Sequence, residues 1–299
     1  FVRVIGGQNN DIYNVAEDSG RKVKIYDYLT KPSTVESQGN AKLRFRDNYM
    51  QNTFDKDKKT FKSGSLTPGI GYNPDDGLKL GIQRIATVNG FKRNPFTTQS
   101  TYQFAYYFGT NSFDLSYQGE FARIWGNFNL LVGANYSNPN SVTNFFGYGN
   151  ETPNYDQDLD FDYNRAKIEK AGIKFGFVRK SPFGSYFGYL ASFEGIKVKE
   201  SQDRFIAEEF NGVNPEVFDR NYFGALTGTY RYESYDKDLN PSRGMKFELI
   251  GGGKINLSDP DRYYGYINPY LGFYNAVSKN RKLVVKSQVQ AQFNIGDDY

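Results

Sequence analysis

The sequence contains no cysteine and no histidine among its 299 residues. Without cysteine, the chain has neither a disulfide framework nor a thiolate metal site. Without histidine, it has no imidazole base, no Ser-His-Asp triad and no histidine metal ligand. Catalysis in this chain would therefore have to use carboxylates, lysine, tyrosine or serine, and we nominate no catalytic residue.

The sequence also lacks any run of about 18 apolar residues, which excludes a membrane-spanning helix. No signal peptide is visible, because the chain opens at Phe1 with strand-like sequence instead of a basic segment and an apolar run. We therefore expect the native N-terminus to lie upstream. The 37 lysines and arginines nearly balance the 33 aspartates and glutamates, and both signs are interspersed, which argues against a nucleic-acid partner.

Aromatic residues and glycine are abundant in a chain of which only 38% of residues are apolar. There are 26 phenylalanines, 25 tyrosines and 31 glycines. A soluble core draws mainly on leucine, isoleucine and valine. The aromatic girdles and half-polar strands of an outer-membrane barrel would produce this bias.

From about Leu66 onward, apolar and polar residues alternate with a period of two, and polar turns interrupt the pattern. In residues 283–295, for example, apolar residues fall mainly on one face, while lysine, glutamine and asparagine occupy the other. These runs predict an all-β protein, a transmembrane antiparallel up-and-down β-barrel with about eleven strands present. The expected strands begin near Leu66, Leu78, Thr98, Ser112, Asn127, Lys167, Gly184, Tyr222, Met245, Tyr263 and Leu283.

The connections between these strands alternate in length, as in bacterial barrels. We expect the long connections, 137–161 and 201–221, at the outer surface, and tight turns near Ser181, Asn240 and Lys279 on the periplasmic side. Single-chain bacterial barrels normally have an even number of strands. We therefore expect the barrel, residues 63–299, to be incomplete at its C-terminus.

Residues 1–62 lack this regular alternation and predict short strands with tight turns, followed by a polar stretch. We interpret them as the end of a periplasmic β module plus a linker. The segment from Gly6 to Tyr13 resembles one rung of the Gly-Gly-x-Gly-x-Asp calcium repeat, with Asn9 in place of the third glycine. Adjacent rungs share their calcium ligands, so one rung is an incomplete site. Asp11 is thus a candidate calcium ligand, although we favour a structural turn.

A second group of carboxylates lies in the first long connection, where Asp156, Asp158, Asp160 and Asp162 alternate with other residues. Such a group could bind a divalent cation or act in acid/base catalysis. We favour a solvated surface loop. The polar residues of the inward face define either a pore or a merely hydrated lumen.

One turn and its flanking strands resemble the outer-membrane assembly-factor superfamily, which includes BamA and the bacterial surface antigen barrels. The turn residues are Tyr232, Asp236, Asn240, Pro241 and Gly244, followed by the alternating residues 245–257. Residues 67–78 are similar to the opening hairpin of the superfamily, and residues 145–151 to a surface-loop motif of its Bacteroidota members. The resemblance covers about residues 65 to 299.

This resemblance implies a sixteen-stranded barrel in the outer membrane of a Gram-negative bacterium, with its N-terminal part in the periplasm. It implies insertion or translocation of outer-membrane proteins, with the lipid bilayer, client proteins or envelope assembly subunits as partners. The five turn residues would have a structural role. The Gly6–Gly7 segment also looks like the junction at which, in Bacteroidota proteins, a calcineurin-like metallophosphoesterase precedes such a barrel, which would then be an anchor or export route. A passive porin-like channel is the third hypothesis.

Overall fold

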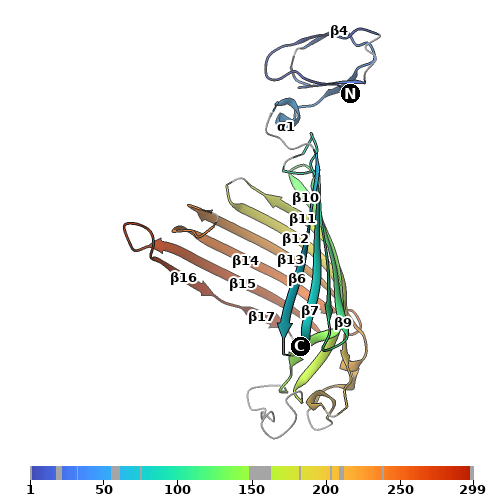
Figure 1. The fold of residues 1–299 in the computed structure, drawn as a ribbon, viewed down its shortest axis with the longest axis vertical. Helices are drawn as coiled ribbons and strands as arrows, with labels where there is room; N and C mark the ends of the chain where they lie inside the picture. Colours follow the sequence, from blue (N-terminus) through green and yellow to red (C-terminus); the bar gives the residue numbers. More distant parts are fainter. Residues whose placement is uncertain are drawn as a thin grey trace. The chain divides into compact units, whose positions relative to one another are not determined.

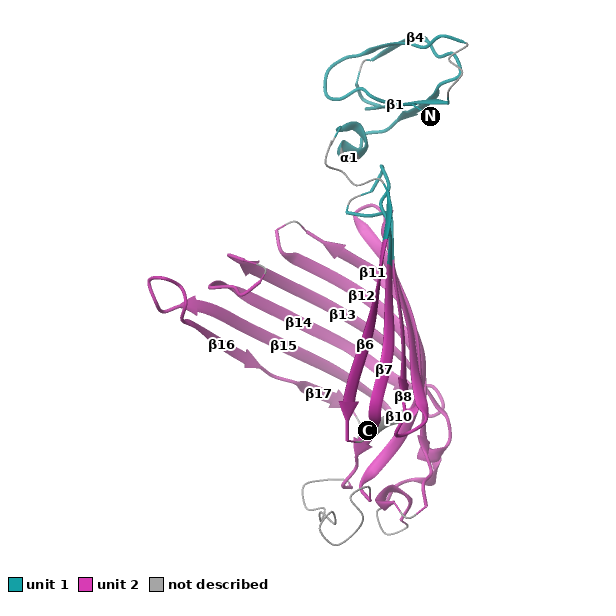
Figure 2. Cartoon of the chain, in the orientation of Figure 1, with its two compact units in different colours: residues 1–63, 86–99 teal, residues 64–85, 100–299 magenta. Residues whose placement is uncertain are grey.

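The computed structural model contains two compact units (Figure 2). Unit 1 comprises residues 1–63 and 86–99, and unit 2 comprises residues 64–85 and 100–299. The sequence-based boundary after residue 62 stays a prediction. The described residues are 2–17, 22–31, 33–54, 61–74, 76–93, 95–147, 163–181, 183–202, 204–208, 212–237 and 239–296.

Unit 1 is built from short parallel strands. They are β1 (Val2–Ile5), β2 (Ile12–Asn14), β3 (Val23–Asp27), β4 (Thr34–Ser37) and β5 (Lys42–Phe45), followed by the short helix α1 (Tyr49–Asn52). One sheet has the order β1-β3-β5, and β2 pairs with β4 in a second sheet. The chain therefore coils: the first two coils each add a strand to both sheets, and β5 then extends the first sheet. Tyr13, Val23, Ile25 and Ala41 form the buried core.

The connection between the second and third barrel strands also belongs to unit 1. Its Phe91 ring lies 5.0 Å from the ring of Tyr26 on β3, measured between centroids. The guanidinium carbon of Arg3 lies 4.3 Å from the centroid of Phe91. Tyr26 is only 3% exposed, so this aromatic contact helps to cover β3, the middle strand of the first sheet.

The barrel strands form one antiparallel 12-stranded sheet, in which strands β6 to β16 pair with their neighbours in the sequence and β17 pairs with β15 (Figure 1). They are β6 (Lys62–Asn73), β7 (Gly77–Val88), β8 (Thr98–Tyr107), β9 (Ser112–Trp125), β10 (Phe128–Asn144), β11 (Arg165–Lys180), β12 (Ser185–Lys199), β13 (Asn221–Tyr235), β14 (Arg243–Asn256), β15 (Tyr263–Ala276), β16 (Val284–Gln290) and β17 (Phe293–Gly296). Their starts lie close to the positions expected from alternation, which confirms the all-β up-and-down prediction. In the described part of the chain, none of the helices has the length and apolar character needed to cross a membrane.

The last expected strand, 283–295, is interrupted in the structure. It appears as β16 and β17, which pair with β15 in one continuous register. Between them the N–H of Ala291 donates a hydrogen bond to the carbonyl of Pro269 at 3.1 Å. Proline has no N–H to donate in return, so the ladder is broken opposite Pro269. The prediction of a single strand is confirmed, with one interruption.

The long connection after β12 folds back onto the strand ends. Its described part contains two short 3₁₀ helices, η1 (Phe205–Ala207) and η3 (Pro215–Phe218). Ile206 is buried with Ala166 of β11 and Val198 of β12 in a small apolar cluster. Antiparallel order brings this connection to the same end of the sheet as the connection after β10.

Candidate functional site: the faces, edge and turns of the sheet

The two faces of the sheet differ in chemistry and in exposure. Along β11 and β13, apolar side chains such as Phe175 and Leu226 lie on one face, and they are 56% and 69% exposed. On the other face, the long side chain of Lys254 on β14 is only 16% exposed. On this face, Lys254 on β14 reaches across β13 to Glu194 on β12, a contact between non-adjacent strands that indicates the concave side of the sheet. Apolar groups on the outside and polar groups on the inside are the arrangement of a barrel that lies in lipid.

Four charged residues of alternating sign form a quartet on the polar face of β13 and β14. Arg231 lies opposite Glu248, and Glu233 lies opposite Lys246. The four nitrogen–oxygen distances lie between 3.4 and 3.9 Å. Each charge thus has two neighbours of opposite sign, so the quartet neutralises itself inside the concave face.

Two further ion pairs join strands across the same face. Lys180 on β11 contacts Glu120 on β9 at 2.8 Å, and the amide of Asn129, on the intervening β10, donates to Glu120 at 2.6 Å. Lys254 on β14 pairs with Glu194 on β12. These carboxylates are engaged in structural pairs rather than held as unpaired acids or bases.

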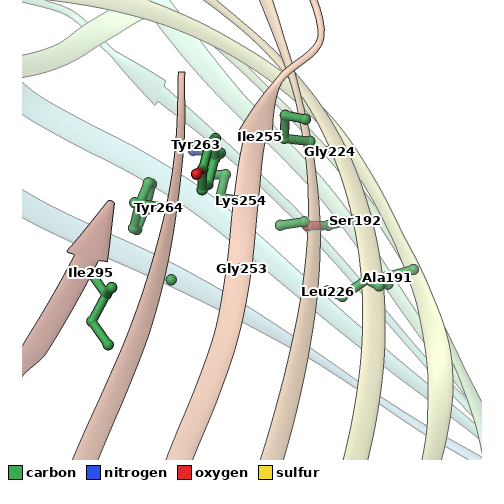
Figure 3. A pocket seen from close by; sticks show the side chains of 12 residues that line it. Ala191, Ser192, Gly224, Leu226, Gly253, Lys254, Ile255, Tyr263, Tyr264 and Ile295 are labelled. Carbon is green, nitrogen blue, oxygen red and sulfur yellow. The ribbon is translucent and has the colours of Figure 1, made fainter. Parts of the chain in front are cut away.

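A shallow hollow of about 840 Å³ lies on the apolar side of the later strands (Figure 3). Glycines such as Gly224 and Gly253 leave gaps in the side-chain cover, and apolar side chains such as Leu226 and Ile295 contribute to the lining. Most of its surface is carbon. It offers apolar contact, as a lipid chain would make, rather than a constellation of polar groups for catalysis.

Strand β6 forms one edge of the sheet. In the described part of the chain, β6 pairs with β7 alone. Its apolar side chains are well exposed, 63% for Leu66 and 79% for Ile70. At Gly69 and Gly71, a β-carbon would meet no atom within 4 Å. Among the described residues, no strand pairs with the outer edge of β6, and at Pro68 this edge lacks an N–H donor.

The turn that the sequence motif singles out connects β13 and β14 and is closed by Asp236. The Oδ1 atom of Asp236 accepts hydrogen bonds from the backbone N–H groups of Ser242 at 2.8 Å and Arg243 at 3.0 Å. The Ser242 hydroxyl donates to Oδ2 at 2.5 Å. The Ser242 hydroxyl, followed by these N–H groups, holds the pKa of Asp236 far below its usual range. Both oxygen atoms of this carboxylate are thus occupied by hydrogen bonds within the turn.

The other motif residues shape the same hairpin. Asn240 has a φ of +54° and Gly244 a φ of +143°. A β-carbon at Gly244 would collide with the carbonyl oxygen of Ser234, so only glycine fits there. Pro241 lies between them in the turn, and Tyr232 pairs with Phe247 on the adjacent strand. The structure thus brings the motif residues together in one hairpin, where their assigned structural role stays a prediction.

Asp11 lies in unit 1 beside a lysine. Its Oδ2 is 2.7 Å from Lys31 Nζ, which also contacts Oδ1 of Asp27 at 3.2 Å. Tyr13 donates to the other oxygen of Asp27 at 2.8 Å. Burial opposes the charged form of Lys31, but the hydrogen bonds to both aspartates raise its pKa overall. The prediction that Asp11 binds calcium stays a prediction.

Sequence reasoning missed two of these groups, the quartet and the partners of Asp11. The quartet does have a signal in the sequence, because each of the two alternating segments that form β13 and β14 carries one positive and one negative residue two positions apart. Recognising it requires the register between the runs. Lys31 and Asp27 have no local signal, since they reach Asp11 only when the next coil is stacked on the first.

Two sequence-based observations fall on other parts of the chain. Asp156, Asp158, Asp160 and Asp162 lie outside the described residues. Within the described residues, no group of three or more aspartates and glutamates is arranged to hold a metal ion. The surface-loop motif is described only as far as Gly147, and there Phe145 lies 5.8 Å from Phe205, between ring centroids.

Comparisons with known proteins identify the fold. No protein-family model matches the chain, and no curated protein matches it by sequence. Among solved structures, it is similar to the crystal structure of BamA from Haemophilus ducreyi lacking POTRA domains 1-3, with a TM-score of 0.53 and 12% identity. The match covers 78% of this chain and 41% of that chain, so the present chain spans less than half of its neighbour. The chain has a BamA-like β-barrel fold.

Proposed function

We propose that this chain is the barrel of an outer-membrane protein that inserts or translocates other outer-membrane proteins. The observation that carries the proposal is a BamA-like sheet with an apolar convex face and a polar concave face. The proposed location, the outer membrane of a Gram-negative bacterium, rests on this fold. The finer expectation of a Bacteroidota-type protein rests on sequence motifs.

The apolar face supports residence in a bilayer. Side chains such as Phe175, Tyr189 and Leu226 are more than half exposed on three different strands. In water, so wide an apolar surface would drive association, whereas hydrocarbon solvates it. The polar face is compatible with a hydrated interior because it carries charged side chains, several of them paired with each other.

The outer edge of β6 is the site that we propose for the action on other proteins. A client β-segment needs partners for its backbone N–H and C=O groups before its own barrel has closed. Strand β6 offers such partners along a 12-residue edge. We infer that clients pair there, as added strands, and leave once their own strands have paired.

Site-specific cross-linking in cells tests this proposal. Because residues 1–299 contain no cysteine, a single cysteine at Leu66 on β6 gives a unique cross-linking position among them. We expect adducts between it and newly made outer-membrane proteins, and loss of those proteins when this protein is depleted. The matched control is a cysteine at Leu226, on the interior strand β13. Equal adducts from both positions, or no effect of depletion, would refute the proposal.

The alternative functions give different results in the same cells. An anchor for a fused metallophosphoesterase, which rests on the Gly6–Gly7 segment, predicts phosphoesterase activity in the envelope and unchanged levels of other barrels. A passive channel predicts single-channel conductance and, again, unchanged barrels.

A further inference from the structure

The segment that resembles a calcium rung holds a cation that belongs to the chain itself. Lys31 Nζ lies 2.7 Å from Oδ2 of Asp11, 3.2 Å from Oδ1 of Asp27 and 3.5 Å from the carbonyl oxygen of Gly7. Gly7 and Asp11 lie between β1 and β2, whereas Asp27 and Lys31 belong to the next coil. The ammonium thus bridges two coils through two carboxylates and a turn carbonyl, as calcium does between adjacent rungs.

The two glycines of the segment make room for this arrangement. A β-carbon on Gly6 would collide with the hydroxyl of Tyr13 and would lie 2.7 Å from Oδ2 of Asp11 and 2.8 Å from Cγ of Asp27. Gly7 has a φ of +76°, which turns its backbone in the left-handed region. The Gly-Gly pair therefore lets polar groups of both coils converge at one point.

The buried carboxylate of Asp27 requires a nearby cation. Its side chain is fully buried. Tyr13 and the backbone N–H of Tyr28 each donate a hydrogen bond of 2.8 Å to it, but neither donor carries a charge. An ionised carboxylate inside a protein is tolerated when a charge of opposite sign is paired with it. The Lys31 side chain, only 8% exposed, supplies that charge.

We propose that Lys31 is the resident cation of this rung, and that its ammonium takes the place of calcium and links the two coils without a metal. The number of oxygen atoms around the site agrees with this assignment. Calcium takes six to eight oxygen ligands. Around Lys31, two carboxylates and one carbonyl converge, which suits the three donors of an ammonium group.

The test is hydrogen–deuterium exchange of the whole protein in detergent, followed in peptides that cover β1 and β3. Exchange is measured with a chelator and again with about 5 mM calcium, a concentration that exceeds the dissociation constants of weak extracellular calcium sites. For the wild type we expect no change on adding calcium. For Lys31→Ala we expect exchange faster by about a hundredfold or more, because Asp27 loses its counter-charge, and substantial recovery in calcium. Lys42→Ala, at an exposed position on β5, is the control and should exchange like the wild type in both conditions.

The double variant Asp27→Asn/Lys31→Ala keeps the test decisive if Lys31→Ala does not fold. It removes both charges, so it should regain much of the protection and show no response to calcium. Protection of the wild type by calcium would overturn the proposal, as would unchanged exchange in Lys31→Ala. Failure of calcium to protect a folded Lys31→Ala, or failure of the double variant to recover, would also overturn it.

Discussion

Replacing Leu226 with arginine tests whether the apolar face meets lipid. Leu226 lies on β13, where its neighbours across the sheet are Ala191 and Gly253, and it is 69% exposed. In a soluble sheet, arginine at so exposed a position would change stability little. In a barrel, the same change places a guanidinium in hydrocarbon.

The expected magnitude follows from depth in the bilayer. Arginine on the lipid face of a barrel costs about 2–4 kcal/mol near the midplane and less near the interfaces. The next residue, Thr227, points to the polar face, where its hydroxyl lies 2.7 Å from that of Tyr266. Thr227→Arg loses that hydrogen bond, about 1 kcal/mol, and leaves the new charge in the hydrated interior. Two substitutions one residue apart should thus differ by roughly 1–3 kcal/mol.

Unfolding by denaturant from lipid vesicles measures the difference. Trp125, the single tryptophan of the sequence and 70% exposed, reports the transfer from lipid to water by its fluorescence. A Leu226→Arg variant as stable as Thr227→Arg would refute the assignment of the two faces. A Thr227→Arg variant that loses more stability than Leu226→Arg would reverse it.

Two further predictions concern the β13–β14 turn. Because the pKa of Asp236 is lowered on folding, its contribution is fully present above the unfolded pKa of about 3.9 and declines progressively as pH falls from there through the lower folded value. The stability difference between wild type and Asp236→Asn should therefore be constant from neutral pH to about pH 5 and shrink below it, as measured by unfolding midpoints; an unchanged difference at pH 2 would contradict this. Gly244→Ala should destabilise the protein by about 1–3 kcal/mol through the collision with Ser234, whereas Gly253→Ala on the same strand, with its nearest contact at an ordinary 3.7 Å, should be nearly neutral in the same titration. Equal effects of these two substitutions would disprove the steric argument.

Much of the barrel is predictable from the sequence because the signal is local. Alternation with a period of two follows from strand geometry, so every strand carries its own evidence. The residues of 283–295 predict one strand, and β16 and β17 occupy that span. Its interruption is not predictable, since it depends on which residue Pro269 faces across the ladder. The turn around Asp236 is detectable because aspartate, asparagine, proline and glycine each have a distinct turn preference.

The sequence by itself determined the class of the protein, its strand spans and which residues share a face, because these follow from the spacing of neighbours along the chain. Only the tertiary structure decided the parallel coils of residues 2–45, the four-charge quartet and the partner of Asp11. Each of these depends on register or stacking between segments far apart in the sequence. Lys31 reaches Asp11 only because one coil lies on the next. The residues next to a charged side chain in the sequence do not indicate which distant residue will pair with it.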